Sequence, residues 1–351
     1  MPLQDYEIRP IDLRSASDAE YVCLNAFENI LRYEVIPEDP AVPLKEDVER
    51  WKATPQLVEE AAWCAWQGAP ERIIAFAGAR IFHTGDNKHL IDFNIEVLPE
   101  FRRQGIARRM LRLAADQART HDRRLMGTES NDRVPAGVEF LNRIGGRRGQ
   151  EARLNQLRLA DLDHSLLQRW REQSAHLAEE FELASLAGRY PDAQMQAFSD
   201  LFQEVANDQP RDSLDLEDIN YSVENMRQFE AMMLAAGRQR RCLYAVDKKD
   251  GRIAALTEIF WNPNNPTILE QAFTGTMPEY RGRGLGRWLK AEMLPRVLRE
   301  WPQALYVRTG NANSNAPMLK INIEMGFKPF IAWSAWQVPT ETVEGYLASG
   351  A

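Results

Sequence analysis

The stretch Pro278-Glu279-Tyr280-Arg281-Gly282-Arg283-Gly284-Leu285-Gly286-Arg287 decides the fold, because it echoes an earlier one, Pro99-Glu100-Phe101-Arg102-Arg103-Gln104-Gly105-Ile106-Ala107-Arg108. Pro, Glu, Arg, Gly and the final Arg recur in register. A strand-like run precedes each copy, at 90–97 and 268–277, and a helical run follows each. Because strand, loop and helix recur together, the pattern predicts two duplicated domains.

Length and element order agree with a duplication. The 351 residues exceed the usual size of a single domain. Strands and helices are predicted in the same mixed order in both halves, which indicates the α+β class. We expect one domain over 1–160, a second over 161–340 and a tail over 341–351.

Composition and charge exclude several classes of protein. The net charge of -8 offers no bulk attraction for nucleic acid or anionic lipid, so we expect neither as a partner. The three cysteines lie far apart and the five histidines are scattered, which predicts no disulfide framework and no metal site. No run of about 18 apolar residues occurs, and the start lacks the features of a signal peptide, so a cytoplasmic protein without a membrane segment is expected.

The glycines and arginines of the second loop point to phosphate binding. Glycine lets the backbone turn tightly and approach a ligand, and the amides at a helix start attract an anion. Arg281, Arg283 and Arg287 would add charged contacts. The first loop is poorer in glycine, since Arg103 and Ala107 stand where the second has Gly282 and Gly286.

The pattern P-x-x-R-x-x-G-x-G/A between a strand and a helix resembles the acetyl-CoA loop of the GCN5-related N-acetyltransferase (GNAT) superfamily. A second segment supports the resemblance: Asn311 to Met318 followed by Asn322 to Phe327 is similar to the block in which an Asn opens a helix and Gly-Phe closes it. The resemblance implies two tandem GNAT-like domains, each with a mixed, largely antiparallel central sheet flanked by helices, and the first domain is the candidate for a degenerate copy.

In such enzymes the cofactor's pyrophosphate sits on the loop amides, its pantetheine arm lies between two splayed strands, and an amine attacks the thioester directly. The resemblance therefore implies acetyl-CoA as cosubstrate and no metal. The implied cofactor-binding residues are Thr276, Met277, Arg281, Gly282, Arg283, Gly284, Leu285, Gly286, Arg287 and Asn315, with weaker binding at Arg102, Arg103, Gln104, Gly105, Ile106 and Ala107. We expect one tight acetyl-CoA per chain, in the second half.

A base must remove a proton from the ammonium group of the acceptor. Alignment of the two loops places Asp92 opposite Gln271 and Glu96 opposite Gly275, so the first half has carboxylates where the second has none. The second half offers Glu258 and Glu270 on or beside neighbouring strands. Glu258, Glu270 and Asp92 are the predicted catalytic residues; the alternative for each is a solvated strand face.

An acid for the departing thiolate is missing at its usual place. Many family members have a Tyr four residues before the Gly that ends the second block, where this chain has Asn322 and, in the first half, Leu141. Neither side chain is a general acid at neutral pH. Three explanations stay open: water acts as the acid, another residue such as Tyr306 does, or one half no longer catalyses.

The sequence therefore predicts an enzyme that transfers an acetyl group from acetyl-CoA to a primary amine of a small molecule, with a cationic metabolite favoured by the acidic chain. The alternative is a non-catalytic CoA-binding or scaffold protein, which the missing tyrosines and the few carboxylates of the second half favour.

Overall fold

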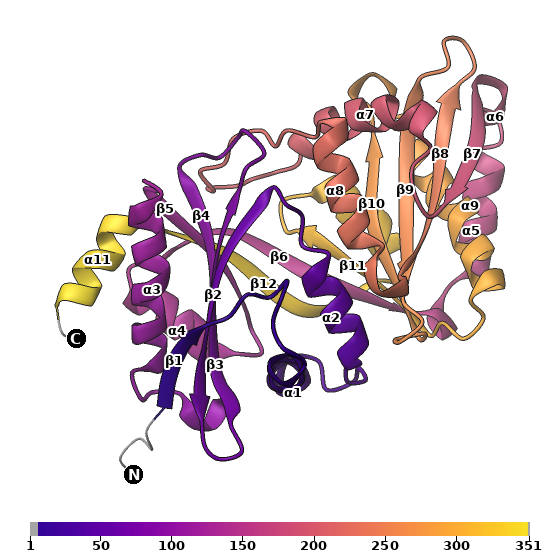
Figure 1. Ribbon diagram of the computed structural model, residues 1–351. Coiled ribbons are helices and arrows are strands. Elements are labelled where there is room, and N and C mark those ends of the chain that lie inside the picture. The colour runs from indigo at the N-terminus through magenta and orange to yellow at the C-terminus, as the bar shows by residue number, and fades with distance from the viewer. Residues whose placement is uncertain (1–5, 350–351) are drawn as a thin grey trace. The chain divides into compact units, whose positions relative to one another are not determined.

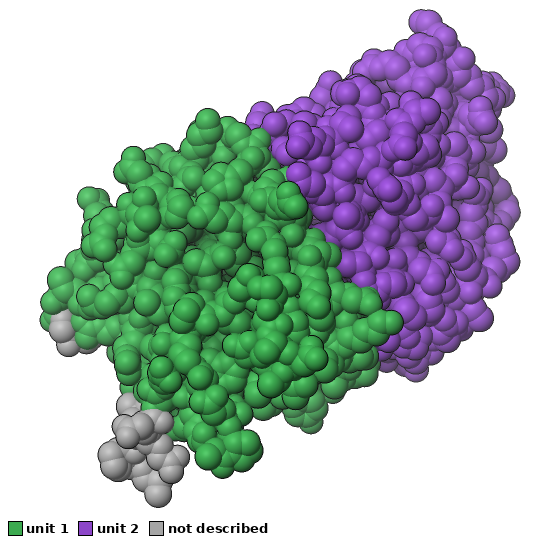
Figure 2. Space-filling view, viewed as in Figure 1, with its two compact units in different colours: residues 1–151, 211–217, 333–351 green, residues 152–210, 218–332 purple. Residues whose placement is uncertain are grey.

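The computed structural model describes residues 6–349, which form two compact units (Figures 1 and 2). Unit 1 comprises residues 1–151, 211–217 and 333–351, and unit 2 comprises 152–210 and 218–332. Each unit thus combines segments from more than one part of the chain, where we expected contiguous halves that meet near residue 160.

Unit 1 has the predicted alternation of strands and helices. Its elements are β1 (Tyr6–Pro10), α1 (Asp18–Val35), α2 (Leu44–Lys52), β2 (Val58–Gln67), β3 (Arg72–Phe82), β4 (Leu90–Val97), α3 (Ile106–Thr120), β5 (Leu125–Asn131), α4 (Pro135–Arg143), most of β12 (Lys328–Pro339) and α11 (Thr340–Ala348). The strands are hydrogen-bonded in the order β1-β2-β3-β4-β5-β12.

Unit 2 repeats this arrangement. Its elements are most of β6 (Arg147–Arg158), α5 (His164–Gln173), α6 (Leu177–Glu180), β7 (Phe181–Ala187), α7 (Met195–Asn207), α8 (Val223–Met233), β8 (Gln239–Asp247), β9 (Ile253–Trp261), β10 (Ile268–Thr276), α9 (Leu285–Glu300), β11 (Tyr306–Ala312) and α10 (Ala316–Glu324). The strand order is β6-β11-β10-β9-β8-β7.

The strand that completes each sheet comes from the other half of the sequence. Residues 333–339 of β12 pair antiparallel with β5 in unit 1, and residues 152–158 of β6 pair antiparallel with β11 in unit 2. This exchange is why the units do not follow the expected boundary. A helix follows each exchanged strand: α11 packs on α3, and α5 packs on α9.

Both sheets are antiparallel except at one pair of strands. In unit 1, β4 runs parallel to β5, and in unit 2, β10 runs parallel to β11. The predicted mixed, largely antiparallel sheets are therefore confirmed. One irregularity distinguishes the units, because β10 carries a bulge between Gln271 and Thr274 against β9, while β4 pairs with β3 in unbroken register.

Helices cover both faces of the sheet in unit 1. Tyr21, Leu24 and Phe27 of α1 pack with Trp51 of α2 on one face. On the other face, α3, α4 and α11 share a core in which Leu111 is fully buried. In unit 2, α7 contacts β9 and β10, α9 contacts β8, β9 and β10, and Figure 1 shows α7 and α8 in front of these strands with α9 behind them.

Two elements differ from the sequence expectations. The segment 147–158, to which the sequence expectations above assign no element, is the strand β6, and most of the tail expected over 341–351 belongs to the helix α11, which ends at Ala348. Val343 and Leu347 anchor α11, with 0% and 6% of their surface exposed. Within residues 6–349, no helix is both long and apolar enough to cross a membrane.

Candidate functional site

The loop between β10 and α9 forms an open cradle of backbone in unit 2. Gly282 and Gly284 have φ angles of 75° and 91°, in the left-handed region that glycine adopts without strain. A Cβ atom at either position would meet no atom within 4 Å. Gly284 is the N-cap of α9 and no side chain of residues 6–349 caps the helix, so the N–H groups of the first turn have no partner inside the helix and are available to a ligand.

Carboxylates pair with the three arginines of this loop. Arg281 pairs with Asp208, Arg283 with Glu180 at 2.6 Å, and Arg287 with Glu324 at 2.9 Å. All three guanidinium groups are thus paired with carboxylates of unit 2.

One donor of Arg287 has no partner among the described residues. The Nε atom of Arg287 is buried, and no residue in the described part of the chain accepts a hydrogen bond from it. A buried donor without an acceptor is costly. Together with the free amides at the start of α9, the loop therefore has donors that suit an anion.

The loop of unit 1 has the same backbone path. Gly105 has a φ of 83° and caps α3, and a Cβ there would again meet no atom within 4 Å. Arg103 adopts a φ of 63°, matching Gly282, although it carries a side chain. The lower glycine content that we noted in the sequence has therefore not changed the conformation of this loop.

The charged groups around the unit 1 loop are used differently. Arg102 makes two hydrogen bonds to Glu34, and its Nε atom donates to the carbonyl of Val97 at 3.0 Å. Arg108 donates to the carbonyl oxygens of Tyr346 and Leu347 at the end of α11, at 3.3 and 3.0 Å. Carbonyl groups at the end of α11 thus accept hydrogen bonds from Arg108, the residue that corresponds to Arg287.

Beside each loop, two parallel strands separate. Pairing of β4 with β5 ends at Asp92 and Gly127, although β4 continues to Val97. Pairing of β10 with β11 ends likewise at Glu270 and Arg308. Beyond these residues, the strand edges that face each other are not paired with another strand among the described residues. Their amide and carbonyl groups are therefore able to pair with a ligand.

This pairing corrects the loop-based alignment of the two halves. Asp92 corresponds to Glu270 and not to Gln271. Each of the two residues makes the third and last pairing of its strand with the parallel neighbour. The bulge in β10 inserts one residue, which the alignment could not reveal.

Polar side chains line the face of β4 that is turned away from α3. Asp92, Asn94 and Glu96 alternate along the strand, as expected from its period of two. Glycines on the flanking strands make room for them: a Cβ at Gly78 would lie 2.5 Å from Oδ1 of Asn94, and one at Gly127 would lie 2.8 Å from Oδ1 of Asp92. The space on this face is therefore occupied by carboxylate and amide groups.

Burial tunes the two carboxylates toward neutral pH. It raises the pKa of Asp92 to about 6, with a further contribution from the nearby charge of Glu129. Burial also raises the pKa of Glu96 to about 7, and the charge of Glu28 acts in the same direction. Both can exchange protons near pH 7, as a general base must.

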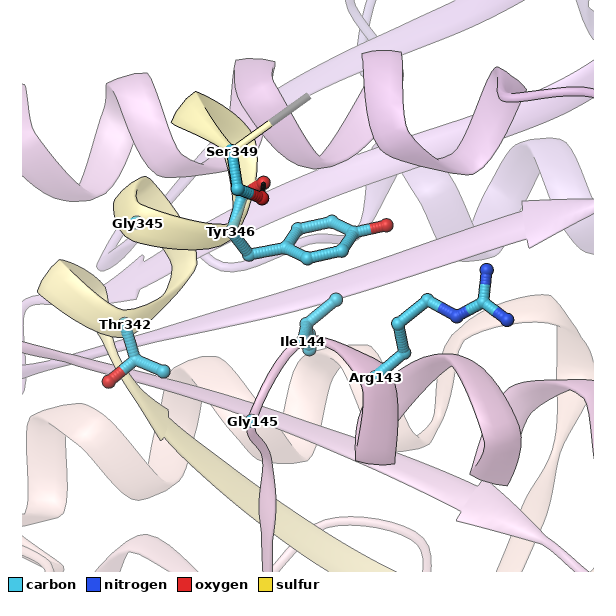
Figure 3. Close-up of a pocket in the computed structure, with 7 residues that line it drawn as sticks. All are labelled: Arg143, Ile144, Gly145, Thr342, Gly345, Tyr346 and Ser349. Atoms are coloured by element: carbon cyan, nitrogen blue, oxygen red, sulfur yellow. Dashed lines mark hydrogen bonds between the residues drawn. The ribbon is translucent and has the colours of Figure 1, made fainter. Parts of the chain in front are cut away.

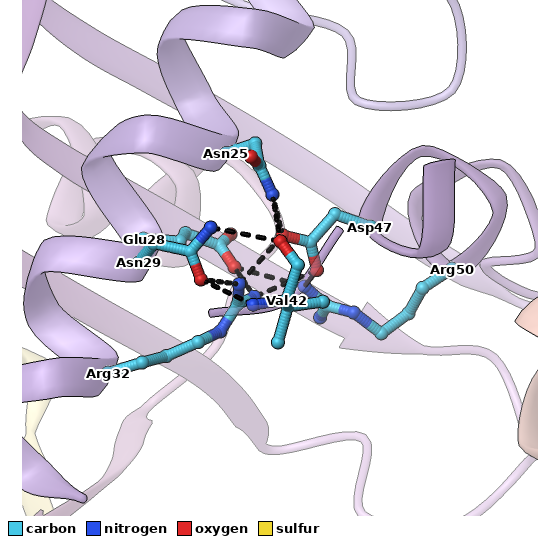
Figure 4. Close-up of polar contacts among 7 residues, drawn as sticks. All are labelled: Asn25, Glu28, Asn29, Arg32, Val42, Asp47 and Arg50. Atoms are coloured by element: carbon cyan, nitrogen blue, oxygen red, sulfur yellow. Dashed lines mark hydrogen bonds and ion pairs between the residues drawn. The ribbon is translucent and has the colours of Figure 1, made fainter. Parts of the chain in front are cut away.

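An ion-pair network joins α1 to α2 near Glu96 (Figure 4). Asp47 has 0% of its surface exposed and accepts hydrogen bonds from Arg32 at 2.7 and 2.8 Å and from Arg50 at 2.8 Å. These bonds and charges lower the pKa of Asp47 despite its burial. The network holds the two helices together on this side of the sheet.

The two second-half candidates for the base are engaged elsewhere. Glu258 is 4% exposed, accepts a hydrogen bond from the hydroxyl of Tyr190 at 2.6 Å, and lies 3.5 Å from Arg240. Burial raises its pKa. Glu270 has half of its side chain exposed and pairs with Arg238. The structure does not bring either side chain together with the 281–287 loop.

Aromatic residues fill the corresponding face of unit 2. Phe273 of β10 stacks on Phe202 of α7 with ring centroids 4.6 Å apart. A Cβ at Gly275 would lie 2.5 Å from Val205 and 2.7 Å from Phe273. Where unit 1 has polar side chains from β4, unit 2 thus has a packed apolar layer.

The second block forms the predicted helix start. The side chain of Asn315 caps α10 by accepting from the amide of Met318 at 3.4 Å. Asn322 is 1% exposed, and its Nδ2 atom donates to Oδ1 of Asn311 at 2.7 Å. Tyr306 lies at the paired end of β11, opposite Ile268, and not where the strands separate.

A buried lysine in unit 2 was not among the residues that the sequence singled out. Lys290 of α9 is 2% exposed, and its Nζ atom donates to Oδ1 of Asn322 at 3.1 Å. Burial alone lowers its pKa to about 7. Only its place on the inner face of the predicted helix could have suggested it.

A shallow hollow lies between the end of α4 and α11 in unit 1 (Figure 3). Its lining residues are Arg143, Ile144, Gly145, Thr342, Gly345, Tyr346 and Ser349. None of them belongs to the two loops or to the polar face of β4. Among residues 6–349, no cluster of three or more His, Cys, Asp or Glu side chains could hold a metal ion.

The chain belongs to the acetyltransferase (GNAT) family. The family model matches residues 28–143 and 199–320, which together make up more than half of the chain and contain both loops. The expectation of tandem GNAT domains is thereby confirmed.

Solved structures share the fold. A tandem GNAT protein from the clavulanic acid biosynthesis pathway, solved without acetyl-CoA, is 23% identical with a TM-score of 0.75, over 96% of this chain and 99% of that one. A GCN5-related N-acetyltransferase from Sphaerobacter thermophilus is 13% identical with a TM-score of 0.65, over 95% and 96%. No curated protein matches the sequence significantly.

Proposed function

We propose that this acetyltransferase uses acetyl-CoA to acetylate a primary amine of a small molecule, and that unit 1 carries out the reaction. The observation that carries the proposal is the position and the raised pKa of Glu96. It lies nine residues before Gly105, on the part of β4 that has separated from β5, and its pKa of about 7 suits a base at neutral pH.

The backbone conformation of both loops supports binding of the pyrophosphate of acetyl-CoA. In unit 2 the residues that would hold it are the amides of 282–287 with Arg281, Arg283 and Arg287, beside Thr276 and Met277 at the end of β10 and Asn315 at the start of α10. In unit 1 they are the residues 102–107. We expected a single tight site in the second half, but the shared backbone path supports two.

Acetyl-CoA supplies an acetyl group activated as a thioester. On the chain's side, Asp92 and Glu129 offer negative charge to an incoming ammonium group, and Glu96 takes its proton to make the amine nucleophilic. The free N–H groups of the separated part of β4 are donors for the developing oxyanion. Leu141 cannot supply a proton to the thiolate, so water is the proposed acid.

The alternative, a non-catalytic CoA-binding role, suits unit 2. Its face over β10 is packed with Phe202 and Phe273, and Glu258 is locked against Tyr190, so neither an acceptor site nor a free base is formed there. We therefore propose that unit 2 binds CoA without turning over an external amine.

Two matched loop variants test the proposal. Release of free thiol from acetyl-CoA is measured with a panel of small amines for Gly105→Glu and Gly284→Glu, each of which places a side chain and a negative charge in one cradle. We expect Gly105→Glu to abolish turnover and Gly284→Glu to spare it, while calorimetry shows the loss of one site in each variant. Full turnover in Gly105→Glu would refute the assignment to unit 1, and no thiol release from the unaltered protein with any amine would favour the non-catalytic alternative.

A further inference from the structure

Lys290 is a buried amine without an ionic partner. Its only hydrogen bond within residues 6–349 goes to Oδ1 of Asn322, at 3.1 Å. An ammonium group has three N–H donors and needs an acceptor for each when it is buried, whereas a neutral amine has two. With one acceptor present, the surroundings favour the neutral and therefore nucleophilic form, in agreement with the lowered pKa, to which no charged side chain contributes.

The amine belongs to a polar chain that spans three elements. Lys290 of α9 donates to Asn322 of α10, and Asn322 donates to Asn311 of β11. Asn311 lies past Arg308, where β11 has separated from β10. This series of hydrogen bonds therefore runs from the helix that follows the loop to the region where β10 and β11 separate.

Unit 1 has no such chain. Lys290 lies six residues after Gly284, and the residue six after Gly105 is Leu111. Asn322 lies four residues before Gly326, and the residue four before Gly145 is Leu141. Leu111 and Leu141 are both buried in one apolar core, so the fold does not require polar groups at these positions.

We infer that Lys290 is an acyl acceptor, which takes the acetyl group from acetyl-CoA bound at the loop of unit 2. The inference rests on the proposed binding of acetyl-CoA at that loop. Lys290 lies about 9 Å along the helix axis from Gly284. Its hydrogen bond to Asn322, and that of Asn322 to Asn311, link the amine to the part of β11 that has separated from β10.

The reaction conserves atoms and charge. The lone pair of Nζ forms a bond to the thioester carbonyl carbon, the C–S bond breaks, and the proton lost from nitrogen ends on the thiolate, giving Nε-acetyl-lysine and free CoA. The resulting amide has one N–H, for which Oδ1 of Asn322 is the acceptor already in place. Unlike the amine, the product cannot become charged, so burial favours it.

The test uses the intact chain with one equivalent of acetyl-CoA, followed by mass spectrometry of the protein and of its peptides. Lys320 is exposed on α10 and reports the background of chemical acetylation. We expect acetyl-Lys290 to exceed acetyl-Lys320 by at least about tenfold, because a bound donor acts at high effective concentration. Gly284→Glu should abolish the modification of Lys290 and leave that of Lys320 unchanged.

Asn322→Asp provides a second, nearly isosteric variant. A carboxylate next to Nζ favours the ammonium form, so acetylation of Lys290 should be suppressed near pH 7 and should recover as the pH is raised. If calorimetry shows acetyl-CoA bound to unit 2 while Lys290 stays unmodified, the inference is overturned and the cofactor assignment survives. If unit 2 binds no acetyl-CoA, the cofactor assignment itself has failed.

Discussion

Glu96→Gln should lower turnover and raise the stability of the fold at alkaline pH. Burial suits the carboxylate to remove a proton near pH 7, but it also makes the charge of the carboxylate costly. Its pKa of about 7 stands well above the ordinary 4.5. At about 1.4 kcal/mol per pKa unit, the ionised form costs roughly 3 kcal/mol, or about 2 after solvent screening of a partly buried group. The neutral amide of Gln keeps the shape and removes this cost.

The sign of the effect depends on pH. Since the folded protein holds this proton more tightly than the unfolded chain, the contribution of Glu96 to stability is full below pH 4.5 and falls as the pH rises through about 7. We therefore expect Glu96→Gln to match the unaltered protein in urea denaturation at pH 4.5 and to exceed it by about 2 kcal/mol at pH 8. Turnover should fall by about 10² to 10⁴, with loss of the limb near pH 7 in the pH-rate profile.

Glu151→Gln is the control, because Glu151 is exposed and pairs with Arg148 on its own strand. It should change neither turnover nor the pH dependence of stability. Unaltered turnover in Glu96→Gln would refute its role as the base. A variant less stable than the unaltered protein at pH 8 would refute the argument from burial.

Four further outcomes follow from the same contacts. Glu270→Gln should leave turnover in the thiol-release assay unchanged, because Glu270 is half exposed and pairs with Arg238. Asp47→Asn should cost about 2 to 3 kcal/mol at pH 7, and below the ordinary pKa of 3.8 this difference should shrink, as calorimetric melting at two pH values can show. Lys290→Met should raise the melting temperature more at pH 6 than at pH 9, because only the lysine must bury a charge at low pH. Leu347→Ala, at the buried end of α11, should cost about 2 to 4 kcal/mol in denaturation by urea.

The loops could be predicted because their chemistry is local. Glycine at a left-handed position, arginines beside it and the start of a helix lie within ten consecutive residues, and both copies adopt the expected turn. Even here, the sequence overstated the difference between the copies, since Arg103 takes the same left-handed conformation as Gly282. A residue type prefers certain backbone conformations, but the surrounding structure can impose another one, as it does at Arg103.

The carboxylates show where prediction from sequence ends. Asp92 and Glu258 were equal candidates on strands, but one faces a space kept open by Gly127 and the other lies in an ion network with Tyr190 and Arg240. The bulge in β10, which makes Glu270 the counterpart of Asp92, leaves no sequence signal either. Burial and charge environment depend on which strands meet, and the meeting strands are far apart in the chain.

By itself, the sequence determined the duplication, the alternation of strands and helices, and the two phosphate-type loops, because each depends on residues close together in the chain. The tertiary structure alone decided that β6 and β12 exchange places, since β6 is a polar segment whose strand conformation comes from its hydrogen bonds to β11. It also decided which acids and bases are tuned: Glu96 and Lys290 owe their pKa values near 7 to burial, which only the packing of the folded chain creates.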